Sequence, residues 1–110
     1  MAKPLQHQII AGALGIVSDE ARWTSKTMAR DSHGKSCSIY ASEAVRFCAV
    51  GALTRAAFDL LGEVPSIALI DETEDHILSS CHLEHLSLPQ MNDRVGREAV
   101  VRMFRKALAH

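Results

Sequence analysis

The stretch that most constrains the fold is residues 47–57, Phe-Cys-Ala-Val-Gly-Ala-Leu-Thr-Arg-Ala-Ala. Its many small side chains would let neighbouring elements approach its backbone closely. Aromatic residues make up only 5% of the chain, so the core must be aliphatic and alanine-rich, which favours helices over strands. We therefore predict a central, largely buried helix over residues 42–62, with Ser42 as its N-cap and Gly62 as its C-terminal cap.

Apolar periodicity predicts three further helical regions, over residues 5–18, 65–85 and 97–109. Asp71 and Glu74 resemble a capping box, so the second of these regions is expected to break into two pieces at Asp71. In the last region Val100 and Phe104 lie on the apolar stripe. The predicted fold is all-α, a compact bundle of four to five helices around the central small-residue-rich helix, forming a single domain over residues 1–110.

Two loops complete the predicted arrangement. The first, residues 20–41, contains the only tryptophan, Trp23, which we interpret as an anchor against the core. It also contains the turn sequence of residues 31–34 and a short extended piece at residues 36–40. The second loop covers residues 86–96, where Asn92 or Asp93 is expected to cap the last helix.

The charge balance argues against nucleic acid as the main partner. Twelve basic and 13 acidic residues give a formal net charge of -1. We interpret the local basic cluster as a solvated helix face with cations near the helix end, and the alternative is a contact with an anion or nucleic acid. This cluster consists of Arg94, Arg97, Arg102, Arg105 and Lys106.

Cysteine usage and the apolar segments bear on the cellular setting. Three cysteines, with no close Cys-x-x-Cys pair, predict neither a disulfide framework nor a zinc ribbon, and a reducing cytoplasm fits best. The apolar run of residues 9–17 is too short to span a bilayer, and no small-residue cleavage site follows it. We expect no membrane partner and no cofactor.

Three segments of the chain resemble a group of small, uncharacterised bacterial and phage-associated proteins, described only as a domain of unknown function. They are WTSKTMARDSHG at residues 23–34, RFCAVGALTRAA at residues 46–57 and LPQMNDRVGREAVVRMFRKAL at residues 88–108. The resemblance implies a compact helical domain in cytoplasmic proteins and brings no established activity. It nominates recurring positions, namely Trp23, Asp31, Gly34, Cys48, Gly51, Asn92 and Asp93.

Cys48 is the candidate nucleophile of the sequence. A position early in a helix would lower its thiol pKa, and His82 or His85 together with Asn92 or Asp93 could complete a Cys–His–Asn arrangement. Against this, Cys48 falls on the predicted buried stripe, and buried cysteine usually behaves as a small hydrophobe. A pocket shared by both loops is the alternative, formed by Trp23, Asp31, Cys48, Asn92 and Asp93.

A further hypothesis is a metal site formed by His76, Cys81, His82 and His85. Zinc accepts these residue types, but their spacing matches no established ligand pattern, and we predict no metal. The preferred function is therefore a protein-interaction or small-ligand-binding module rather than an enzyme, and the alternative is a hydrolase-like enzyme using Cys48. Self-association or a protein partner is expected of such a domain.

Overall fold

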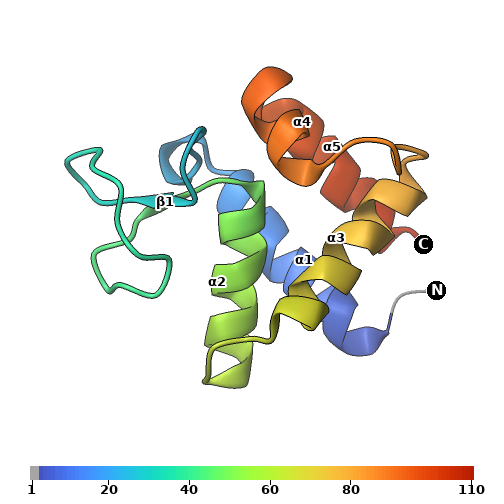
Figure 1. The fold of residues 1–110 in the computed structure, drawn as a ribbon, viewed down its shortest axis with the longest axis horizontal. Helices are drawn as coiled ribbons and strands as arrows, with labels where there is room; N and C mark the ends of the chain where they lie inside the picture. Colours follow the sequence, from blue (N-terminus) through green and yellow to red (C-terminus); the bar gives the residue numbers. More distant parts are fainter. Residues whose placement is uncertain (1–2) are drawn as a thin grey trace.

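The computed structural model describes residues 3–110, in which five helices pack around a common core and an irregular segment projects to one side (Figure 1). A 3₁₀ turn, η1, follows the first helix, and two two-residue strands pair antiparallel within the irregular segment. The helices are α1 (Pro4–Val17), α2 (Ala49–Leu61), α3 (Ile67–Ser80), α4 (Leu88–Arg94) and α5 (Arg97–Leu108), the 3₁₀ turn is η1 (Glu20–Arg22), and the strands are β1 (Ala29–Arg30) and β2 (Arg46–Phe47). This confirms the predicted all-α bundle.

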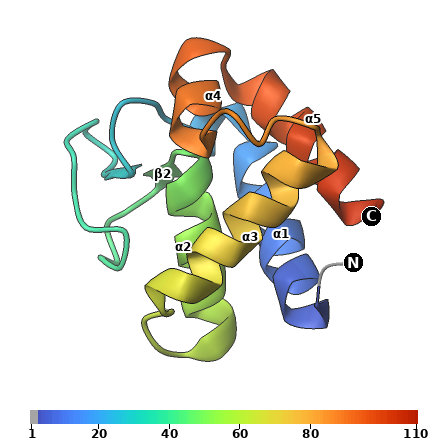
Figure 2. The same cartoon turned by 45° about the vertical axis from the view of Figure 1, so that its right-hand side comes forward.

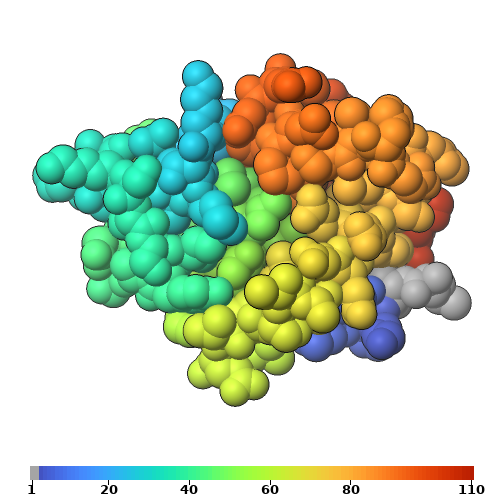
Figure 3. Space-filling model, in the orientation of Figure 1, coloured from blue at the N-terminus to red at the C-terminus, as the bar shows by residue number. Residues whose placement is uncertain are grey.

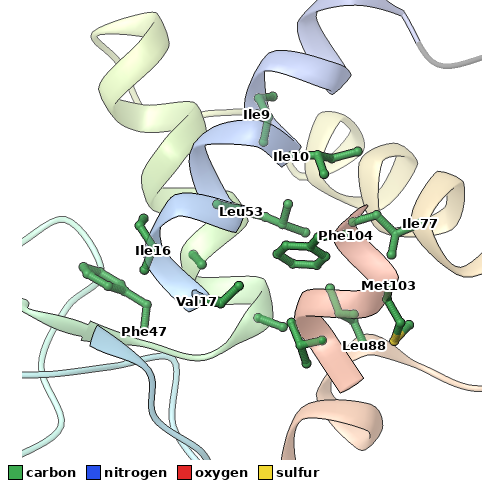
Figure 4. Close-up of a cluster of buried hydrophobic side chains, with 14 of the residues drawn as sticks. Ile9, Ile10, Ile16, Val17, Phe47, Leu53, Ile77, Leu88, Met103 and Phe104 are labelled. Carbon is green, nitrogen blue, oxygen red and sulfur yellow. The ribbon is translucent and has the colours of Figure 1, made fainter. Parts of the chain in front are cut away.

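The core lies where α1, α2, α3 and α5 meet (Figure 2). Phe104 of α5 lies at its centre, and the close-up shows it beside Leu53 of α2 (Figure 4). Ile10 of α1 and Ile77 of α3 belong to the same cluster, and all four side chains are fully buried. Each such side chain contributes about 1.5–3 kcal/mol when it is removed from water. The α5 stripe predicted from Val100 and Phe104 is therefore confirmed.

The central helix is shorter than predicted. It begins at Ala49 rather than near Ser42, because residues 46–47 form β2 and pair with β1 instead of continuing the helix. Cys48 is the N-cap, and its sulfur accepts a hydrogen bond from the Gly51 amide at 3.3 Å. The Ser42 cap was wrong, whereas the predicted Gly62 cap is confirmed by its left-handed φ of 73°.

Two predictions for the neighbouring segments were also wrong. The region of residues 65–85 does not break at Asp71, because Ser66 caps a single helix, α3, and Glu74 accepts a hydrogen bond from the Leu88 amide. The expected extended piece at residues 36–40 is reduced to one isolated bridge between Ser36 and Arg30, while β1 and β2 carry the sheet pairing.

The second loop contains a helix that was not predicted. Ser87 and Gln90 form a capping box that starts α4, with Pro89 in its first turn. Asn92 and Asp93 therefore lie inside α4, and the residue before α5 is Gly96, which has no side chain to cap it. The expected capping role of Asn92 or Asp93 was wrong because both side chains bind other segments.

Across residues 3–110, the structure has no helix with the length and apolar character needed to cross a membrane. The three cysteines, Cys37, Cys48 and Cys81, are all unpaired.

Gly51 provides a direct test of the close contact between α2 and the irregular segment. A Cβ atom at this position would lie 2.1 Å from the Met28 carbonyl oxygen, a backbone atom that cannot move aside without shifting its segment. We expect Gly51→Leu to lower the free energy of unfolding by at least about 1–3 kcal/mol in urea denaturation. Gly51→Ala should already be destabilising for the same reason.

Gly15 on α1 is the matched control. A Cβ atom there meets nothing within 4 Å, so Gly15→Ala should stabilise the helix by about 0.5–1 kcal/mol. If Gly51→Leu unfolded at the same urea concentration as the unmodified chain, the close contact with Met28 would be wrong.

Candidate functional site

The side chain of Asn92 joins α4 to two distant segments of the chain. Its Oδ1 accepts hydrogen bonds from the Trp23 indole Nε1 at 2.8 Å and from the Ala49 amide at 3.0 Å. Its Nδ2 donates to the Thr24 carbonyl oxygen at 3.1 Å and to Asp93 Oδ1 at 3.0 Å. These four bonds use the full donor and acceptor capacity of the amide, which is only 1% exposed.

The same network completes the start of α2. The first amides of a helix have no partner within the helix, and here Asn92 binds that of Ala49 while Cys48 binds that of Gly51. Residues 23–28, named here the Trp loop, are thereby held against the N-terminus of α2. The packing of Trp23 against the core confirms its predicted role as an anchor.

Asp93 holds the Trp loop at a second point. Its Oδ1 accepts a hydrogen bond from the Lys26 amide at 2.9 Å, in addition to the one from Asn92. The Asn92 amide, and after it the Lys26 amide, lowers the pKa of the Asp93 carboxyl, so Asp93 is ionised at neutral pH. Lys26 adopts a left-handed conformation with φ of 67°, which costs a non-glycine residue about 1–2 kcal/mol.

A pocket of about 250 Å³ opens where the Trp loop, α2 and α4 meet. In Figure 3 this is the place where the light-blue, green and orange segments meet. Met28, Val50 and Pro89 give it apolar walls, and the Asp93 carboxylate lies at its edge. Its full lining is Lys26, Thr27, Met28, Cys48, Val50, Pro89 and Asp93.

The structure thus brings together four of the five residues predicted to share a pocket. Cys48 and Asp93 line it, and Asn92 and Trp23 form the hydrogen-bonded support behind it. Sequence reasoning missed Lys26, Met28, Val50, Thr27 and Pro89. The capping box of Ser87 and Gln90 is the signal that would have placed Pro89 and Asp93 on one helix.

Asp31 does not line this pocket. Its carboxylate is occupied by its own turn, where Oδ1 accepts hydrogen bonds from the amides of His33 and Lys35. The bond from Lys35 is the main cause that lowers the pKa of Asp31. Arg30, which the sequence did not single out, links this turn to the Trp loop through Thr24 Oγ1 at 2.8 Å and the Gly34 carbonyl at 2.9 Å.

The environment of Cys48 does not favour a nucleophile. The residue is only 7% exposed, and burial raises the pKa of its thiol, although the Gly51 amide partly offsets this. The sequence predicted that the helix start would lower this pKa, and burial outweighs that effect. Among the described residues, the lining of this pocket includes no histidine that could take the proton of Cys48.

The four residues of the metal hypothesis do not form a metal site within the described part of the chain. Within residues 3–110, no three His, Cys, Asp or Glu side chains are placed to hold one metal ion. His76 contacts the Ala107 carbonyl oxygen through Nε2 at 3.3 Å, and Cys81 points its sulfur at the Met103 carbonyl oxygen. His85 lies exposed between α3 and α4, and His82 has a left-handed φ of 58° just after α3.

The fold and the pocket define a small helical bundle with a pocket between its Trp loop, the first turn of α2 and α4. The chain belongs to a family of unknown function, DUF6197, whose model matches residues 1–110. Searches of curated proteins and of solved structures found no significant match.

Removal of the Asn92 side chain tests whether the amide network holds the domain together. We expect Asn92→Ala to lower the free energy of unfolding by about 3 kcal/mol or more, because it leaves the Trp23 indole and Ala49 amide without an acceptor. Urea denaturation followed by the fluorescence of Trp23, the single tryptophan, measures the effect.

Arg94→Ala, an exposed change on the same helix, is the control and should alter stability by less than about 0.5 kcal/mol. Equal stability of the two variants would show that the Asn92 network is not needed for the fold.

Thiol accessibility tests the burial of Cys48. In the folded protein we expect Cys48 to react with a disulfide reagent at neutral pH more slowly than Cys37 and Cys81, which are less buried. Mass spectrometry of labelled peptides would give the order of reaction. Rapid labelling that disappears in Cys48→Ser would contradict the burial and restore Cys48 as a candidate nucleophile.

Proposed function

We propose that this protein is a binding module whose pocket at the Trp loop holds a short apolar group that ends in a cation or a hydrogen-bond donor. The observation that carries the proposal is the Asp93 carboxylate, fixed through Oδ1 by Asn92 and Lys26 at the edge of an apolar pocket. Asp93 Oδ2 makes no hydrogen bond within residues 3–110, so it is free to accept one from a ligand.

The size of the pocket limits the ligand. A volume of about 250 Å³ lies below the roughly 300–1,000 Å³ of pockets that bind drug-sized molecules. A ligand with few heavy atoms, or a single side chain of a protein partner, would fit. Met28 and Val50 supply apolar contact for such a group, while Asp93 supplies its orientation.

The free oxygen of Asp93 favours a hydrogen-bond donor over an anion, while the lining as a whole has one side chain of each charge, Lys26 and Asp93. Lys26 also lines the pocket, but its backbone amide, not its ammonium group, binds Asp93, and the two side chains form no ion pair within residues 3–110. A bound ammonium group could therefore approach Asp93 Oδ2 directly and form a charge-assisted hydrogen bond.

Three molecules with the same branched apolar tail test the proposal, namely isopentylamine, isopentanol and isovalerate. We expect affinity to fall in that order when the full chain is titrated and amide shifts of the Trp loop, α2 and α4 are followed by NMR. Binding of the amine should weaken as the pH falls through the pKa of Asp93, which lies below its ordinary value.

Asp93→Asn should remove the preference for the amine and leave isopentanol binding nearly unchanged. Asp71→Asn, which neutralises an exposed carboxylate of α3 outside the pocket, is the matched control and should keep the preference. Equal binding of all three molecules, or shifts spread over the whole surface, would contradict the proposal.

Self-association, a protein partner and a cytoplasmic location stay predictions of the sequence. A protein partner would be compatible with the same pocket, because a projecting lysine side chain has an apolar stem and an ammonium end.

A further inference from the structure

The basic residues of the chain are concentrated on and just before α5. Of the 12 basic residues, five lie within residues 94–106, a stretch whose single acidic residue is Glu98. The rest of the chain contains 12 of the 13 acidic residues, so this segment differs in charge from the remainder. Such a separation produces a local positive potential that the formal net charge of -1 conceals.

Three of these arginines line one pocket of about 320 Å³ between α5 and the end of α1. This arginine pocket is separate from the one at Asp93 and shares no residue with it. It is lined by Ser18, Arg97, Glu98, Val101, Arg102 and Arg105.

Arg97 is held in place by the end of α1. Its Nη1 donates to the carbonyl oxygens of Val17 at 3.3 Å and Ser18 at 3.1 Å. A guanidinium group has five N–H donors, so most of those of Arg97 are left for another acceptor. The fixed position reduces the side-chain entropy that a ligand would otherwise have to overcome.

None of the three arginines forms an ion pair with a carboxylate within residues 3–110. Within the described part of the chain, the one ion pair shorter than 4.0 Å joins Arg55 and Asp59 on α2, away from this pocket. Glu98 lines the pocket without pairing with any of its arginines, so the lining side chains have a formal charge of +2. Planar guanidinium groups match the geometry of phosphate oxygens.

We propose that the arginine pocket binds the phosphate group of a small phosphorylated molecule. Arg97 supplies a fixed hydrogen-bond donor to the phosphate. The exposed side chains of Arg102 and Arg105 donate to its remaining oxygens. The Glu98 carboxylate repels the phosphate and so lowers the affinity of the pocket for it.

The test uses the full chain and pyrophosphate as the probe, with sodium chloride at matched ionic strength as the reference. We expect saturable amide shifts in α5 and at the end of α1. Arg102→Gln and Arg105→Gln should each weaken binding by about three- to tenfold, since each removes a charged hydrogen-bond donor. Glu98→Gln should strengthen binding by about threefold because it removes a repelling charge.

Lys35→Gln is the matched control, since it removes one positive charge from an exposed turn outside the pocket. It should leave pyrophosphate binding unchanged, and unaltered thermal unfolding would show that all four variants keep the fold. The proposal is overturned if pyrophosphate gives no saturable shift, or if Lys35→Gln weakens binding as much as Arg102→Gln.

A short single-stranded oligonucleotide separates a free phosphate from a phosphate in a nucleic acid backbone. Pyrophosphate binding that survives in the presence of the oligonucleotide supports a small phosphorylated ligand. Binding of the oligonucleotide to α5 without any binding of pyrophosphate overturns the proposal in favour of a nucleic-acid surface.

Discussion

One buried amide joins parts of the chain that are far apart in sequence. Asn92 lies 43 residues from Ala49 and 69 from Trp23, and it binds both through a single oxygen atom. Because the amide is almost completely buried, each of these donors would cost about 1–3 kcal/mol if it lost its partner. The position of the Trp loop, the start of α2 and the orientation of α4 therefore depend on one another.

The close approach of the Trp loop to α2 also requires that residue 51 has no side chain, which only glycine provides. The Met28 carbonyl oxygen accepts a hydrogen bond from the Cys48 amide at 3.2 Å and lies only 2.1 Å from the place that a Cβ atom of residue 51 would take. Gly51 thus allows the backbone of the Trp loop to approach the first turn of α2. The small residues of this helix predicted close contact with neighbouring elements. At Gly51 the neighbour is a loop rather than another helix.

Local patterns predicted the helices with their own periodicity and end signals. The bounds of α1 and α5 differ from the prediction by at most one residue at each end, and Gly62 ends α2 as expected. The start of α2 could not be read in this way, because it depends on the pairing of Phe47 with Ala29, a contact between distant residues. The prediction that Asn92 caps the last helix was wrong for a related reason. Its residue type favours caps, but its side chain is used by tertiary hydrogen bonds.

Only polar residues of the candidate site could be predicted from the sequence. Cys48, Asn92 and Asp93 belong to residue types that suggest chemistry, whereas Met28, Val50 and Pro89 look like ordinary apolar positions. What makes them a pocket is the left-handed turn at Lys26 and the bond from its amide to Asp93. Neither feature has a local sequence signal, since a lysine with positive φ is uncommon.

The junction between α4 and α5 explains how one short segment contributes to two separate pockets. Asp93 binds the Trp loop, whereas Arg97, four residues later, binds the end of α1. A continuous helix would place residues four apart on the same face. Gly96, with φ of 113°, interrupts the helix between them and turns the two side chains toward different neighbours. Asp93 and Arg97 therefore line different pockets on either side of a single backbone turn, at a position where any residue with a Cβ atom would be strained.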